Sequence, residues 1–148
     1  MGVGQPRREL RDCWGVELVS VGVGMPAHML LNAWGVLVED ALGAQAYLVG
    51  SATRSKVWRD VDVRVMLTDD EWQHWLPGVP PEGGFVWPRW AALSMAFSAW
   101  GQAATGLPID FQLQHLAHAN TRYLDGAREP LGFRIRSTSL LRQAGDEA

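Results

Sequence analysis

Three aspartates have types and spacing that suit metal chemistry: Asp60 and Asp62 in the stretch DVDV (60–63), and Asp110 in IDF (109–111). Side chains two apart in a strand share a face, so we predict that Asp60 and Asp62 point the same way, with Cα atoms about 6.5 Å apart. Carboxylates this close repel unless a positive charge lies between them, and Mg²⁺ (or Mn²⁺) supplies that charge to oxygen ligands. A third carboxylate from a neighbouring strand completes a site for two metals, the arrangement used in phosphoryl and nucleotidyl transfer.

A second chemical feature is the dipeptide Gly50-Ser51, which ends an apolar stretch upstream of the aspartates. Glycine lets the backbone approach a phosphate closely. Ser51 offers a hydroxyl and backbone amides to phosphate oxygens. Arg54 and Lys56 follow in the same polar segment, and one or both are candidates to pair with a triphosphate. We therefore predict a phosphate-binding corner here.

The spacing of apolar residues and the positions of proline and glycine predict the helices and strands that hold these residues. Helical spacing predicts amphipathic or apolar helices at 27–42 and 87–104, and a capping box at Thr68 and Glu71 begins a short helix to about 76. Apolar runs and alternation predict strands at 44–49, 61–67 and 109–113, with a weaker extended stretch at 17–23. Residues 77–84 are a predicted loop, 115–125 a helix or a loop, and the segment from 134 a polar tail. The fold class is α+β (mixed α/β), with a small mixed sheet backed by helices.

Composition narrows the class of protein. The length of 148 residues indicates one domain, 1–148, with 47% hydrophobic and 20% charged residues. A net charge of −3 excludes a global basic field for nucleic acid. The lone Cys13 excludes an internal disulfide, and we find neither a signal peptide nor an apolar run of about 20 residues. We therefore expect a cytoplasmic protein with no membrane partner.

At these residues the sequence resembles a known family. The stretch VGS at 49–51, eight further residues and DVDV at 60–63 resembles the signature of the DNA polymerase beta-like nucleotidyltransferase superfamily, in its minimal single-domain type. The segment IDF at 109–111 is similar to the third carboxylate strand of that family. The resemblance implies a nucleotidyltransferase fold and Mg²⁺-dependent transfer of a nucleoside monophosphate from a nucleoside triphosphate. By matching positions, Gly50 and Ser51 would bind phosphate, and the three aspartates would hold metal.

The resemblance leaves the acceptor open among a protein hydroxyl, an RNA end and a small hydroxylated molecule. Minimal members often work with a separate protein partner or as oligomers, which we expect here too. An alternative is a catalytically weak or inactive nucleotide-binding or regulatory module of the same fold. A third hypothesis treats the motif as coincidence and the tryptophan-rich middle of the chain as a partner surface. We assign the acidic run at 69–71 to helix capping, and His115 with His118 to a structural or solvated pair.

Overall fold

One small sheet organises the chain. The computed structural model describes residues 22–124 and 126–132, and its sheet has the strand order β3-β2-β1-β4. Strand β1 is antiparallel to both β2 and β4, whereas β2 and β3 run parallel. The strands are β1 (Ala46–Val49), β2 (Val61–Leu67), β3 (Ile109–His115) and β4 (Glu129–Pro130). The predicted fold class, a small mixed sheet backed by helices, is confirmed.

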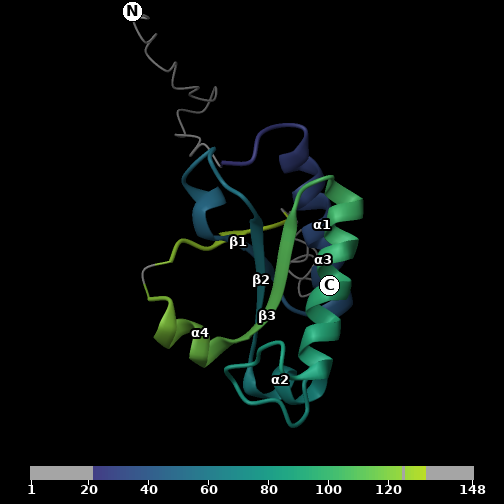
Figure 1. Cartoon of the computed structure of the whole chain (residues 1–148), viewed down its shortest axis with the longest axis vertical. Coiled ribbons are helices and arrows are strands. Elements are labelled where there is room, and N and C mark those ends of the chain that lie inside the picture. Colours follow the sequence, from purple (N-terminus) through teal and green to yellow (C-terminus); the bar gives the residue numbers. More distant parts are fainter. Residues whose placement is uncertain (1–21, 125, 133–148) are drawn as a thin grey trace, which may run out of the picture.

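Helices cover one face of this sheet more fully than the other. The two long helices, α1 (Ala27–Leu42) and α3 (Pro88–Thr105), pack on each other and lie on one side of the sheet, and α4 (Leu116–Arg122) lies on the opposite side (Figure 1). The short helix α2 (Asp69–Trp75) follows β2, and a 3-10 turn, η1 (Gly50–Thr53), follows β1. Within the described residues, none of these helices is long and apolar enough to cross a membrane.

The core lies between the sheet and the two long helices. Alternate residues of β2 (Val61, Val63 and Val65) are fully buried, and Phe111 of β3 is buried beside them. Trp34 of α1 packs edge-on against Phe111, with ring centroids 6.2 Å apart. Because strand side chains alternate between faces, burial of these residues places the intervening polar residues on the other face of the sheet.

Several tryptophans of the middle third belong to this core. Trp72 and Trp90 are buried, and their indole N–H groups donate to the carbonyls of Val79 at 2.8 Å and Leu113 at 3.0 Å. Buried indoles with satisfied N–H groups are core residues. Trp87 and Trp100 are more accessible, each 37% exposed, and are the tryptophans of this stretch that remain open to a partner.

Helix ends match the signals in the sequence. Gly43 ends α1 in the left-handed conformation, with φ 73°, which is common for a glycine just past a helix C-terminus. The capping box of α2 is present: the Thr68 backbone N–H donates to Glu71 Oε2 at 2.8 Å, and the Glu71 backbone N–H donates to Thr68 Oγ1 at 3.5 Å. Local sequence therefore sets where β2 stops and α2 begins.

Replacing Thr68 with alanine is expected to destabilise the protein by about 1 kcal/mol, because the first turn of α2 loses its side-chain acceptor. Urea unfolding followed by circular dichroism measures this. Thr121→Ala is the control, since Thr121 is an exposed helical threonine whose hydroxyl donates to the Ala117 carbonyl inside α4 and caps nothing. Equal midpoints for Thr68→Ala and the wild type would show that the box contributes no stability.

Some boundaries differ from the predictions. The strand predicted from 44 begins at 46, and β3 runs two residues further than predicted, to His115. Strand β2 has the predicted bounds, Val61–Leu67, and the Val61 N–H donates to the Pro108 carbonyl at 2.9 Å. Asp60 lies just ahead of the strand, so the strand geometry from which Asp60 and Asp62 were predicted to share a face does not extend to Asp60. The segment 115–125, predicted as a helix or a loop, contains helix α4. Strand β4 was not predicted. Of the stretch predicted at 17–23, only 22 and 23 are described and neither is in a strand; the predicted tail from 134 lies outside the described residues.

Candidate active site

The polar face of the sheet brings two of the three aspartates together. In the parallel pair β2–β3, Asp62 lies directly opposite Asp110, and Arg64 lies opposite Gln112. Directly paired residues share a face, so these four side chains project from the side of the sheet away from α1 and α3. The equal spacing of Asp62 and Asp110 from the starts of their strands produces this juxtaposition, which no local signal in either strand specifies.

The end of β1 adds a glycine against the first aspartate. Val49 pairs with Asp62, so the chain turns into η1 beside this carboxylate. Gly50 has φ 74°, and a Cβ at this position would collide with Asp62 Oδ2. The Thr53 hydroxyl donates to the Gly50 carbonyl at 2.7 Å and holds the turn. Glycine is therefore required here both by backbone conformation and by the approach of the carboxylate.

An arginine lies between the two carboxylates. Arg64 Nη2 is 3.4 Å from Asp62 Oδ1 and 3.3 Å from Asp110 Oδ2. Its Nη1 donates to the backbone carbonyls of Asp110 at 2.5 Å and Val63 at 3.1 Å, and its side chain is only 11% exposed. The guanidinium is thus fixed, partly desolvated and shared by both acids. It supplies the positive charge that the sequence analysis assigned to a metal alone.

The pKa of Asp62 is raised above its ordinary value. Burial is the largest cause, because it disfavours the charged carboxylate, and the nearby Asp110 and Asp60 raise the pKa further. Arg64 opposes these effects but does not cancel them. Asp62 and Asp110 thus share a single guanidinium, which leaves room in the charge balance of the site for a further cation.

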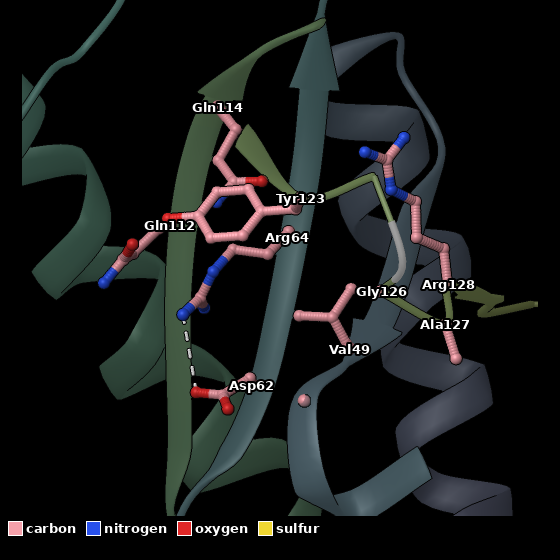
Figure 2. A pocket seen from close by; sticks show the side chains of 10 residues that line it. Val49, Asp62, Arg64, Gln112, Gln114, Tyr123, Gly126, Ala127 and Arg128 are labelled. Carbon is pink, nitrogen blue, oxygen red and sulfur yellow. Dashed lines mark hydrogen bonds and ion pairs between the residues drawn. The ribbon is translucent and has the colours of Figure 1, made fainter. Parts of the chain in front are cut away.

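A pocket opens over this face of the sheet, with a volume of about 260 Å³. Figure 2 shows Asp62 at one end of it, Arg64 in its floor and Tyr123 across from the strands, with Gln112 and Gln114 on β3. The lining residues are Val49, Gly50, Asp62, Arg64, Gln112, Gln114, Tyr123, Gly126, Ala127 and Arg128. The pocket thus joins the end of β1, the polar faces of β2 and β3, and the segment that leads into β4.

The predicted site residues separate into three groups. Gly50 and Asp62 line the pocket, and Asp110 is paired beside them. Asp60 lies just ahead of β2, is half exposed, and forms an ion pair with Arg59 at 3.4 Å; it is close enough to contribute to the raised pKa of Asp62. The other three predicted residues, Ser51, Arg54 and Lys56, are exposed and do not line the pocket.

The donor set suits a magnesium ion. Across residues 22–124 and 126–132, no group of three or more His, Cys, Asp or Glu side chains is close enough to hold a metal. Proteins usually bind Mg²⁺ through only one or two carboxylates, with water and substrate phosphates as the other ligands. Asp62 and Asp110 fit that requirement, and Asp60 is near enough to add charge. A cation that binds both carboxylates must compete with Arg64.

Several residues that line the pocket were not predicted as site residues. Arg64 follows Asp62 by two residues, and Gln112 and Gln114 follow Asp110 by two and four. Because every second residue of a strand points to the same face, this spacing could have placed all three on the face of the aspartates. Tyr123 and Arg128 gave no such signal. They reach the pocket through α4 and the segment before β4, both placed by tertiary packing.

Comparison with known families, proteins and structures identified no similar protein. No protein-family model, no curated protein and no solved structure matches the chain. The resemblance to nucleotidyltransferases therefore rests on the motif residues of the sequence.

Proposed function

We propose that this protein is a metal-dependent nucleotidyltransferase that moves a nucleoside monophosphate from a nucleoside triphosphate to a hydroxyl acceptor. One observation carries the proposal: Asp62 and Asp110 lie side by side on parallel strands, with Gly50 against the first of them. Paired carboxylates can hold the divalent cation of a triphosphate, and a glycine beside them leaves the backbone open to the phosphates.

Each residue has a role in this proposal. Asp62 and Asp110 hold Mg²⁺ or Mn²⁺, with Asp60 adding negative charge. When bound, the ion withdraws charge from the phosphate oxygens and from the departing pyrophosphate. Gly50 lets the backbone approach the phosphates, and Arg64 donates hydrogen bonds to their oxygens.

The reaction itself breaks one bond and forms one. The acceptor oxygen bonds to the α-phosphorus, the bond from that phosphorus to the bridging oxygen breaks, and pyrophosphate leaves with the bond electrons. Asp110, whose side chain is 40% exposed, accepts the proton of the acceptor hydroxyl. The acceptor is a protein hydroxyl, an RNA end or a small molecule, presented by a partner protein or by a second copy of this chain.

Thermal melting with ATP, GTP, CTP and UTP, each with and without Mg²⁺, tests the proposal. A triphosphate at about 100 times its Kd is expected to stabilise the wild type by roughly 2.7 kcal/mol, and only with Mg²⁺. Asp110→Asn is expected to lose this gain, whereas Asp70→Asn, at an exposed position of α2, keeps it. Equal melting of the wild type under all eight conditions would overturn the proposal.

A second candidate function is a nucleotide-binding module of the same fold without turnover. The position of Arg64 between the two carboxylates favours it, because the guanidinium already occupies the space that a shared metal needs. Metal-dependent binding with no release of pyrophosphate identifies this alternative. Pyrophosphate release with any hydroxyl acceptor identifies the enzyme.

Arg64→Gln separates two effects of the guanidinium. We expect the affinity for Mn²⁺ alone to rise, because the competing cation is removed, and the affinity for inorganic tripolyphosphate in Mg²⁺ to fall about tenfold, because a charge-assisted hydrogen bond is lost. Titration calorimetry measures both. Arg59→Gln is the matched control, since Arg59 pairs with the half-exposed Asp60 and its own side chain is 94% exposed. Unchanged affinities in Arg64→Gln would remove Arg64 from the site.

A further inference from the structure

Three polar groups of the pocket lie beyond Asp62 along the strands and have no hydrogen-bond partner within the described part of the chain. Gln112, Gln114 and Tyr123 all line the pocket. Among the described residues, neither amide side chain nor the Tyr123 hydroxyl has a hydrogen-bond partner, whereas Gln102 of α3, on the other side of the sheet, donates to the Ile109 carbonyl at 3.2 Å. Unpaired amides grouped in one pocket are suited to a ligand that offers both donors and acceptors.

The pocket has a charged end and a neutral end. Asp62 and Arg64 form the charged end, and the two glutamines lead away from it along β3. At about 3.3 Å a residue, Gln112 and Gln114 lie roughly 6.5 Å and 13 Å along the strand from Asp110. The guanidinium of Arg128, in the wall, is engaged with Asn120 Oδ1 at 2.7 Å. A ligand with phosphates at one end and a neutral hydrogen-bonding group at the other matches this order.

The volume limits what enters. About 260 Å³ lies below the roughly 300–1,000 Å³ typical of sites that enclose a drug-sized ligand, so part of a bound nucleoside triphosphate would remain outside the pocket. The side chain of Tyr123 is half exposed and offers an aromatic face on the open side of the pocket (Figure 2). Aromatic rings stack on nucleobases, and amides pair with the donor and acceptor on a base edge.

We propose that Gln112, Gln114 and Tyr123 form a nucleobase subsite that selects one nucleoside triphosphate among the four. This inference rests on the proposed function, because the phosphates of the same ligand must lie at Asp62 and Arg64. The amides read the hydrogen-bonding edge of the base, and the Tyr123 ring packs on its face. The selected base gains hydrogen bonds, whereas a mismatched base leaves amides unpaired in the pocket.

Titration calorimetry in Mg²⁺ with the four nucleoside triphosphates and with inorganic tripolyphosphate tests the subsite. We expect one nucleotide to bind the wild type at least about tenfold more tightly than the other three and than tripolyphosphate. Gln112→Leu and Gln114→Leu are expected to lose that preference and to bind tripolyphosphate as the wild type does. Tyr123→Phe retains the stacking that Tyr123→Leu loses. Gln73→Leu, at an exposed position of α2 outside the pocket, is the control.

The outcomes distinguish this inference from the proposed function. Tripolyphosphate that binds as tightly as every nucleotide overturns the subsite and leaves the metal–phosphate site standing. Equal affinities for the four nucleotides, or a base preference that survives both glutamine substitutions, also overturn the subsite. Failure of the wild type to bind tripolyphosphate or any nucleotide in Mg²⁺ overturns both proposals.

Discussion

Asp62→Asn is expected to abolish metal-dependent binding of nucleoside triphosphates. Asp62 is the one predicted metal ligand that lies opposite Asp110, against Gly50 and in the pocket at once. An amide keeps the shape of the side chain but removes the charge that a divalent cation needs. The Mg²⁺-dependent gain of roughly 2.7 kcal/mol at about 100 times Kd should disappear, and with it any pyrophosphate release. Retention of the gain would show that Asp62 holds no metal.

The same substitution is expected to stabilise the protein in the absence of metal. Because the pKa of Asp62 is raised, the folded state holds its proton more tightly than the unfolded chain does. The stability from this group is fully present below the ordinary pKa of 3.8 and is lost as the pH rises through the folded-state pKa. Asp62→Asn removes that loss, and Arg64 keeps its partner Asp110 at 3.3 Å.

Urea unfolding across pH, in chelator, measures this effect. The stability of Asp62→Asn minus that of the wild type should grow as the pH rises from about 3.5 to 7. Asp70→Asn, which removes a charge from an exposed position at the start of α2, should show no such growth. A difference that shrinks with rising pH would contradict the raised pKa.

Gly50→Ala is expected to destabilise the fold and also to disable the site. With φ 74°, a residue with a Cβ carries a backbone cost of about 1–2 kcal/mol. The added carbon also meets Asp62 Oδ2, and relieving that clash adds about 1–3 kcal/mol and displaces the carboxylate. Chemical unfolding and the Mg²⁺-dependent melting shift measure the two consequences separately.

Gly43→Ala is the matched control for this experiment. Gly43 has φ 73°, nearly the same as Gly50, but a Cβ there meets no atom within 4 Å. It therefore carries only the backbone cost, and nucleotide binding should be intact. If Gly50→Ala and Gly43→Ala lose equal stability and both keep the melting shift, the close approach of Gly50 to Asp62 contributes neither to stability nor to nucleotide binding.

Local signals in the sequence determined most of the elements. Alternation in 61–67 predicted β2 because every second residue is a buried valine or leucine, and Gly43 and Thr68 marked helix ends through backbone conformation and capping. These are interactions within a few residues, so a sequence displays them directly. Strand β4 has only two residues, and it pairs with Tyr47 and Leu48, about 80 positions away in the sequence. A pattern of neighbouring residues therefore could not predict it.

The sequence by itself determined which residue types were available: paired carboxylates, a glycine before a turn, and alternating polar residues on two strands. Only the tertiary structure decided which of them meet. The parallel register of β2 and β3 set Asp62 against Asp110 and left Asp60 ahead of the strand. That register also brought Arg64 between the two acids, while Ser51, Arg54 and Lys56 stayed exposed. The physical reason is that strand pairing is fixed by burial of the valines on the opposite face, a constraint that acts between segments distant in the chain.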